Sequence, residues 1–196
     1  MLPERAQSTT SRALPRICLT LLPVLLVAAG CASGARTDAM TAAVSPGTIV
    51  ADASPLRGAF RVGTVTGGNE TNPLWKSNVS NENFRAALEQ SLALHAMTAR
   101  DQGRYLVNAE LASLDQPFGG FDLTVTAKVH YTVVALADQA VKLDTTIESP
   151  YTAEFGDALL GPERLRLANE GAMHENIAAL IKRLIYAARP GQPLSL

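Results

Sequence analysis

The sequence contains little cysteine and little histidine, which limits the chemistry that its side chains can support. Cys18 and Cys31 are its two cysteines, and His95, His130 and His174 are its three histidines. No two histidines have the i, i+4 spacing of a helical metal site. The sequence also lacks the Gly-x-Ser-x-Gly and Ser-x-x-Lys motifs of serine nucleophiles. We therefore predict that the protein is not an enzyme and that it binds no metal or other cofactor.

Positive charge is not in excess either. The chain has 17 basic and 18 acidic residues, and it lacks the concentrated basic patch that a nucleic-acid-binding protein needs. We expect no nucleic-acid partner. Acidic residues fall at turns or on the polar faces of expected strands, where solvation accounts for them, and a catalytic carboxylate pair is the alternative. These acidic residues are Asp122, Asp144, Glu148, Glu154 and Asp157.

The first 30 residues have the order of a secretory signal. Arg5, Arg12 and Arg16 form a basic leader, and residues 17–30 form an apolar run that ends in small residues. This run has about 14 residues, whereas a helix needs roughly 20 apolar residues to span a bilayer. We predict that residues 1–30 are a cleaved signal peptide and not a membrane span.

The residues around Cys31 resemble the lipobox of bacterial lipoproteins, in which the peptide is cut before a cysteine that then carries lipid. Residues 27–33 read Val-Ala-Ala-Gly-Cys-Ala-Ser, with Ala28 where the family usually has leucine. The resemblance implies diacylglycerol and an acyl chain such as palmitate on Cys31, and Ala32 after it implies sorting to the outer membrane. Several acyl chains hold a domain on a bilayer without a spanning helix. A secreted protein without lipid is the alternative.

The segment that follows Cys31 has the composition of a linker. Residues 31–57 are rich in Ala, Ser, Thr, Gly, Asp and Pro, and their few apolar residues show no sustained period. Such a composition favours a flexible tether between the lipid and the folded part. The alternative is that residues 48–50 pair as an edge strand.

Apolar spacing in the rest of the chain predicts four strands and two helices. The clearest period-two alternation runs from residue 123 to residue 133, so its odd-numbered residues should face a core. Ser80 as an N-cap and Pro162 at a first helical position mark the two helix starts. Gly171, inside the last helix, should permit close approach by a neighbouring element. The expected elements are strand 59–65, helix 81–99, strands 105–111, 123–133 and 141–151, and a helix from residue 161.

This order, β-α-β-β-β-α, predicts an α+β fold with a four-stranded antiparallel sheet and both helices packed on one face. Residues 58–188 should form a single domain, and residues 189–196 a disordered tail. In its lipidated cysteine, tether and order of elements, the chain resembles small bacterial outer-membrane lipoproteins, in particular the LptE-like lipopolysaccharide-assembly lipoproteins. The resemblance implies lipopolysaccharide or an outer-membrane protein as the first partner class, and it assigns no binding residue.

Aromatic residues in three loops are the candidates for a partner-binding surface. Trp75 stands in the polar loop 69–78, and Phe118 and Phe121 stand in a turn between two strands. Phe155, in the link between the last strand and the last helix, is a further candidate. Aromatics in such positions anchor protein interfaces. The alternative is that these side chains pack under the sheet edge as part of the core.

Together these features favour a non-enzymatic, lipid-anchored protein on the periplasmic face of the outer membrane that supports cell-envelope assembly. Its expected contacts are the inner leaflet of the outer membrane, through the lipid, and an envelope protein or lipopolysaccharide. Two alternatives stay open. One is an outer-membrane regulator of a peptidoglycan synthase, for which a tether of about 25 residues is short. The other is a periplasmic hydrolase without a recognisable motif.

Overall fold

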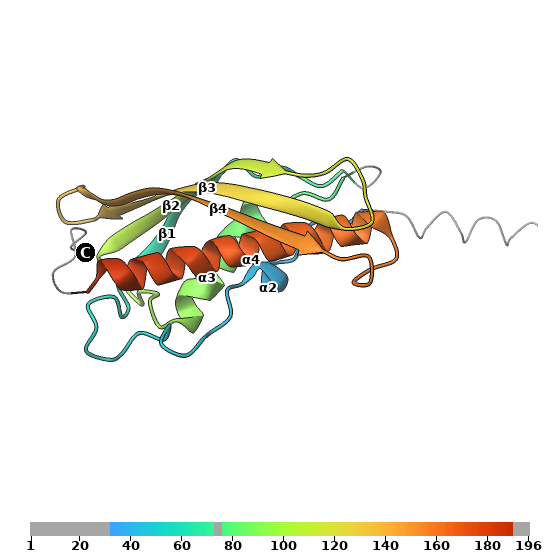
Figure 1. The fold of residues 1–196 in the computed structure, drawn as a ribbon. Coiled ribbons are helices and arrows are strands. Elements are labelled where there is room, and N and C mark those ends of the chain that lie inside the picture. The colour runs from blue at the N-terminus through green and yellow to red at the C-terminus, as the bar shows by residue number, and fades with distance from the viewer. Residues whose placement is uncertain (1–31, 73–75, 190–196) are drawn as a thin grey trace, which may run out of the picture. The chain divides into compact units, whose positions relative to one another are not determined.

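The computed structural model describes residues 32–72 and 76–189. The expected signal peptide 1–30, the expected lipid attachment site Cys31, the candidate residue Trp75 and the tail from residue 190 lie outside the described residues. Figure 1 shows the elements, which in chain order are α2 (Thr37–Met40), β1 (Phe60–Thr66), α3 (Asn81–Leu94), β2 (Tyr105–Asp115), β3 (Leu123–Ala135), β4 (Val141–Ala153) and α4 (Gly161–Ala187).

The four strands form one sheet in the order β1-β2-β3-β4. β2, β3 and β4 pair antiparallel, as expected, whereas β1 pairs parallel with β2. The α+β fold is therefore confirmed, and the expectation of a purely antiparallel sheet is wrong at one edge. The reason is the crossover through α3, which lies between β1 and β2. The helix returns the chain to the end of the sheet at which β1 began, so β2 runs in the same direction as β1.

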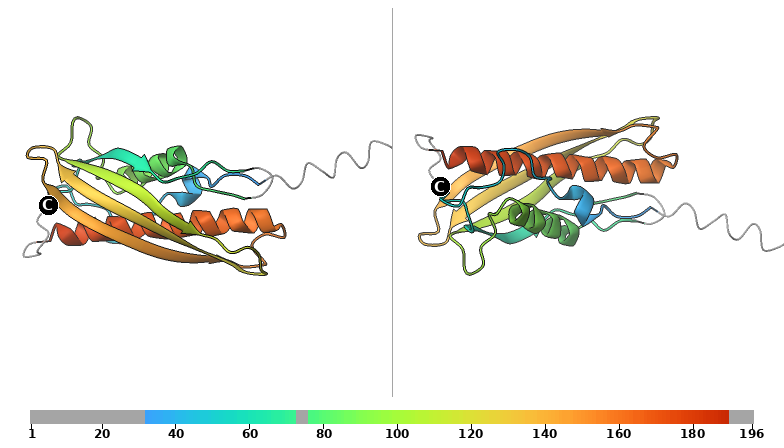
Figure 2. Two further views of the ribbon diagram at one scale, coloured as in Figure 1. Left: turned by 90° about the horizontal axis from the view of Figure 1, so that it is seen from above. Right: turned by 90° about the horizontal axis from the view of Figure 1, so that it is seen from below.

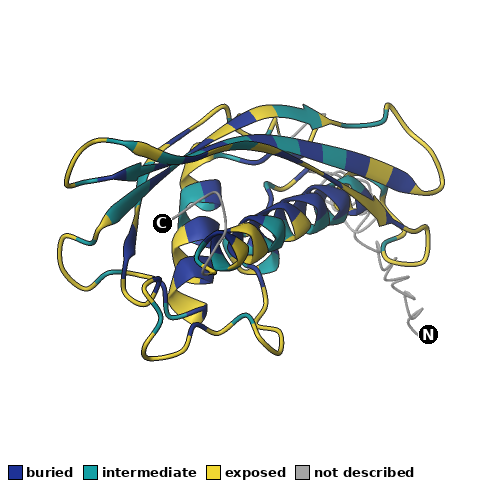
Figure 3. Ribbon diagram, turned by 60° about the vertical axis from the view of Figure 1, so that its left-hand side comes forward, coloured by how far each residue is buried: buried dark blue, intermediate teal, exposed yellow. Residues whose placement is uncertain are grey.

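The helices cover one face of this sheet and leave the other open (Figure 2). α4 packs on β3 and β4, and α3 packs on β1. Burial along β3 alternates residue by residue, with the odd-numbered residues buried, which confirms the predicted register (Figure 3). The buried side chains of β3 are Leu123, Val125, Ala127, Val129, Tyr131, Val133 and Ala135.

A buried polar contact fixes α4 on the two strands beneath it. The Tyr131 hydroxyl donates to Asn176 Oδ1 at 3.0 Å. Asn176 Nδ2 in turn donates to the carbonyl oxygens of Ala127 on β3, at 3.1 Å, and Ile147 on β4, at 2.9 Å. Complete burial raises the pKa of the Tyr131 phenol, so the hydroxyl keeps the proton that it donates. Each buried polar atom in this group thus has a partner.

Helix α3 begins where the sequence predicts and ends earlier. The Ser80 side chain accepts from the Asn83 amide, as an N-cap should. The predicted end at residue 99 is wrong, because Ala96 adopts a left-handed φ of 61° and turns the chain out of the helix. Met97 is then buried, and Thr98 pairs with Phe60 in an isolated parallel bridge. Tertiary pairing therefore overrides the helical spacing.

Helix α4 begins at Gly161 with Pro162 in its first turn, as predicted. Gly171 lies against Tyr151 of β4, and a Cβ atom at this glycine would come within 2.3 Å of the Tyr151 ring. The expected close approach is thus made by an aromatic side chain from the sheet. Among residues 32–72 and 76–189, no helix has both the length and the apolar character needed to cross a bilayer.

Residues 35–57, here called the strap, include α2 and run along α3 and α4. The Ala35 amide donates to the Asn78 carbonyl at 3.0 Å, and farther along the Val50 amide donates to the His95 carbonyl at 3.3 Å. The flexible tether expected over residues 31–57 is therefore wrong for this stretch. The edge strand expected as its alternative is also wrong, because no strand includes residues 48–50. Apolar side chains hold the strap in the core, namely Ala35, Met40, Ala42, Val50 and Leu56.

An ion-pair cluster joins the start of the strap to α4. Glu170 is almost fully buried, and its carboxylate accepts from Arg36 Nε at 3.1 Å and from Arg166 Nη1 at 2.7 Å. The hydrogen bond and the charge of Glu170 raise the pKa of Arg36. Because a buried carboxylate is costly without partners, this cluster fixes the position at which the strap leaves α4.

Candidate functional site

Two loops at one end of the domain expose a group of large apolar side chains, here called the tip. The β2–β3 loop contributes Phe118, which is fully exposed, and Phe121, which is 78% exposed. The β4–α4 loop contributes the rest of the group. These are Phe155 at 45%, Leu159 at 81% and Leu160 at 51% exposure.

The two loops of the tip contact each other. The rings of Phe121 and Phe155 meet edge to face with their centroids 5.7 Å apart, a favourable geometry for aromatic pairs. Beside them, Asp122 Oδ1 accepts a hydrogen bond of 3.0 Å from the Phe155 amide. The tip is therefore one surface built from two chain segments and not two independent loops.

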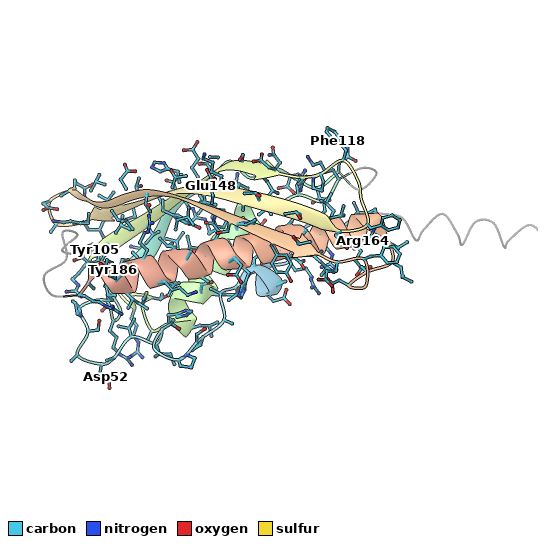
Figure 4. All side chains as sticks on the ribbon, viewed as in Figure 1. Asp52, Tyr105, Phe118, Glu148, Arg164 and Tyr186 are labelled. Carbon is cyan, nitrogen blue, oxygen red and sulfur yellow. The ribbon has the colours of Figure 1, made fainter. Side chains whose placement is uncertain are left out.

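Arg164, in the first turn of α4, holds both loops from beneath. Its guanidinium donates to the carbonyl oxygens of Ala158 at 2.6 Å and Leu159 at 3.1 Å, and across to Gly120 at 3.4 Å. The same group lies over the Phe155 ring, 5.0 Å from its centroid. Figure 4 shows Arg164 at the same end of the domain as Phe118. The residue is only 6% exposed. Sequence reasoning missed Arg164, although a basic residue in the first turn of a helix opposes the helix dipole and calls for a specific partner.

The structure separates the predicted aromatic candidates. Trp75 lies outside the described residues. Phe118 and Phe121 are exposed, so the alternative that they pack under the sheet edge is wrong. Phe155 is half-buried because Arg164 covers one face of its ring. Three of the four candidates thus come together in one exposed surface, and their binding of a partner stays a prediction.

The described chain begins at the same end of the domain as the tip. Ala35 is bonded to Asn78, and the neighbouring Ser77 carbonyl accepts from Gln116 Nε2, in the β2–β3 loop, at 2.9 Å. The views in Figures 1 and 2 agree, since the light-blue start of the described chain lies at the same end of the domain as the orange start of α4 and the β2–β3 loop. Ala32 and Ala35 are both buried, so the folded part begins within one residue of Cys31.

A broad groove of about 880 Å³ lies at the opposite end, between the end of α3 and the start of β2. Three arginines line it, and small residues and one carboxylate complete the wall. The lining residues used below are Arg57, Arg100, Asp101 and Arg104. We call this hollow the arginine groove.

The three arginines are held to different degrees. Arg57 donates to the Val50 carbonyl at 3.0 Å and pairs with Asp52 at 3.0 Å. Arg104 donates to the Pro55 carbonyl and lies 5.9 Å from the Tyr105 ring centroid. Arg100 has no hydrogen bond or ion pair with any other residue that the structure describes. Its guanidinium is thus free to meet a ligand.

The tip and the arginine groove lie at the two ends of β2. Tyr105 begins the strand beside the groove, and Asp115 ends it before the β2–β3 loop. Eleven residues at about 3.3 Å each separate the two sites by roughly 35 Å along the strand. In Figure 4, the labels of Tyr105 and Phe118 accordingly stand at opposite ends of the sheet.

The three histidines, and two carboxylates of the open sheet face, have structural partners. His95 is buried and contacts the Ser91 carbonyl, and His174 contacts the Thr41 carbonyl. On the open face, His130 lies 2.8 Å from Asp144, and Lys128 lies 2.6 Å from Glu148. The Glu148 hydrogen bond raises the pKa of Lys128. In the described part of the chain, no cluster of three or more His, Cys, Asp or Glu residues could hold a metal ion.

Comparison with known proteins defines the fold and leaves the function open. No protein-family model and no curated protein matches the sequence. Among solved structures, XCC0632 from Xanthomonas campestris, a DUF330 protein, aligns with a TM-score of 0.54 and 10% identity, over 74% of this chain and 92% of that chain. This similarity shows a shared fold.

Two weaker structural similarities have TM-scores below 0.5. The protein CT253 from Chlamydia trachomatis has a TM-score of 0.48 and 9% identity, over 66% of this chain and 96% of that chain. Lipoprotein GNA1162 from Neisseria meningitidis has a TM-score of 0.28 and 8% identity, over 50% of this chain and 69% of that chain. The resemblance to LptE-like proteins is not confirmed by these similarities and stays a prediction.

Proposed function

We propose that the protein is a non-enzymatic lipoprotein that is anchored through lipid on Cys31 and binds an anionic envelope component in the arginine groove. The anchor places it on the periplasmic face of the outer membrane, and binding supports assembly of the cell envelope. The first ligand class to test is lipopolysaccharide, whose lipid portion carries phosphate groups. This choice keeps the LptE-like role that the order of elements and the lipobox favour.

The observation that carries this proposal is the composition of the groove. Arg57, Arg100 and Arg104 face a space of about 880 Å³ with Asp101 as the acidic residue in its wall. Guanidinium groups bind phosphate through two parallel hydrogen bonds, and these charge-assisted bonds are stronger than neutral ones. The remaining wall of small residues leaves room for a bulky head group. An anionic ligand therefore fits this surface better than a cationic or apolar one.

A binding measurement with purified lipopolysaccharide tests the groove. Arg100→Ala should weaken binding about ten-fold, because a hydrogen bond to a charged group contributes about 1.5 kcal/mol or more. Lys182→Ala is the matched control, since Lys182 is an exposed cation on α4 outside the groove. Two results would reject lipopolysaccharide as the ligand of the groove. One is unchanged binding in both Arg100→Ala and the double variant Arg100→Ala/Arg104→Ala. The other is an equal loss of binding in Lys182→Ala.

The anchor has a separate test with a matched control in the same chain. Cys31→Ser should abolish incorporation of labelled palmitate in cells and release the protein from the membrane fraction. Cys18→Ser should retain both, because Cys18 belongs to the expected signal peptide. If Cys31→Ser incorporates as much label as Cys18→Ser and the parent chain, Cys31 is not the lipidated residue.

A further inference from the structure

We propose that the tip inserts into the membrane interface beside the lipid anchor, so that the domain stands on the bilayer by its β2–β3 and β4–α4 loops. The partner of these loops is thus a lipid surface. This inference rests on the proposed anchor at Cys31 and adds a second, non-covalent contact with the same membrane. It also assigns a role to Phe118, Phe121 and Phe155 that differs from binding a protein.

The tip gathers apolar surface that a protein in water alone would not expose. Five of the eleven exposed large hydrophobic side chains of the described residues lie in these two loops. Exposed apolar groups that cluster in this way mark sites for a partner or a membrane. The other exposed members of that set are spread over the strap, β4 and the helices α3 and α4, and none of these elements contributes more than two of them.

The start of the folded chain supplies the argument for a membrane. Ala32 is 7% exposed and Ala35 is 1% exposed, so almost no slack separates a lipid on Cys31 from the domain. Consecutive Cα atoms are about 3.8 Å apart, so the anchor holds this end of the domain at the bilayer surface. The contacts from Ala35 through Asn78 and Ser77 to Gln116 place that end beside the β2–β3 loop.

The tip is held in an outward arrangement. Arg164 bonds three loop carbonyl oxygens, and Asp122 bonds the Phe155 amide, so the backbone of both loops is fixed from within. Fixed loops pay little conformational entropy on binding a surface. Phe118 and Leu159 are therefore presented to the surface and not folded back over the sheet.

The charges near the tip decide what kind of bilayer it enters. Asp122, Glu154 and Asp157 lie in or beside the two loops, whereas the basic Arg164 is buried beneath them. A negatively charged rim gains nothing from anionic lipids and is repelled by them. Insertion is therefore driven by apolar burial. It should occur on zwitterionic phosphatidylcholine and should be insensitive to salt.

Tryptophan fluorescence of the full acylated protein in phosphatidylcholine vesicles tests the inference. The native tryptophan is first removed by Trp75→Phe, and Phe118→Trp is then added as the probe. Brominated acyl chains should quench this probe at least about two-fold, and its emission should shift to shorter wavelength, because the ring lies among the lipid chains. Tyr186→Trp is the matched control at the far end of α4 (Figure 4) and should show neither change.

Flotation of the same vesicles keeps the two proposals apart. Protein that does not float with the vesicles contradicts the anchor itself. Protein that floats while Phe118→Trp is quenched no more than Tyr186→Trp overturns the insertion of the tip and leaves the anchor intact. Leu159→Trp is a second probe in the other loop, and circular dichroism confirms that each variant is folded. An unquenched probe at both positions would favour a protein partner for these loops.

Discussion

The two ends of the domain use arginine in opposite ways. At the anchor end, where the tip lies, Arg164 is buried and its Nη atoms donate to loop carbonyl oxygens. At the far end, Arg100 lines a groove and has no hydrogen bond or ion pair among the described residues, whereas Arg57 and Arg104 each bond a carbonyl oxygen of the strap. Arginine therefore builds a surface where its Nη donors bond loop carbonyl oxygens, and it offers a binding site where its guanidinium is exposed. Burial and partners, and not residue type, separate the two roles.

The ion-pair cluster of the anchor end should give the largest loss of stability. Glu170→Ala removes the buried carboxylate partner of Arg166 and leaves it the half-exposed Glu163, which should lower the free energy of unfolding by about 3–5 kcal/mol. Glu163→Ala removes a half-exposed partner of the same arginine and should cost less than about 1 kcal/mol. Urea denaturation of both variants measures the difference. Equal losses would show that the strap is not fixed by Glu170.

The contrast between the two kinds of arginine has its own matched pair. Arg164→Met keeps the apolar stem and leaves three loop carbonyl oxygens without their donor, so it should destabilise the protein by about 2–3 kcal/mol. Arg100→Met changes an exposed side chain and should stay within about 0.5 kcal/mol of the parent protein. Melting temperatures of the two variants compare them directly. If Arg100→Met destabilises as much as Arg164→Met, the arginine groove is structural.

A smaller effect is expected where α4 meets β4 at the anchor end. Gly171→Ala would place a Cβ atom within 2.3 Å of the Tyr151 ring, and such overpacking costs about 1–3 kcal/mol. Helix propensity alone predicts the opposite sign, a gain of about 1 kcal/mol. Gly119→Ala, where no atom lies within 4 Å, is the control and should change stability little. If Gly171→Ala is more stable than the parent protein, the Tyr151 ring does not pack against Gly171.

The sequence predicts the parts of this fold that a short periodic pattern determines. The alternation along residues 123–133 specifies which face of β3 is buried, and Pro162 marks the start of α4. Pattern does not specify the direction in which β1 pairs, because alternation is the same in parallel and antiparallel strands. That direction follows from the α3 crossover, which the order β-α-β already contained.

The strap and the tip show two further limits of sequence reasoning. The buried apolar residues of the strap, such as Met40 and Val50, have no period because the segment is irregular, so composition suggests a linker although these side chains lie in the core. For the tip, the sequence identifies Phe118, Phe121 and Phe155 as candidates. It does not show that the two loops meet over Arg164, because that contact joins residues 44 positions apart. The arginine groove is likewise assembled from separate segments.

The height of the two ends above a bilayer tests the central claim most directly. Energy transfer to a membrane dye is measured from a fluorophore at Gly119→Cys in the β2–β3 loop, and separately at Asp101→Cys in the arginine groove. Because Cys31 carries lipid in the processed protein, each label is unique. Since β2 spans roughly 35 Å between the two sites, the groove label should lie at least about 20 Å farther from the membrane than the tip label. Equal heights, or a groove label nearer the bilayer, would contradict a domain that stands on its tip and presents the arginine groove to the periplasm.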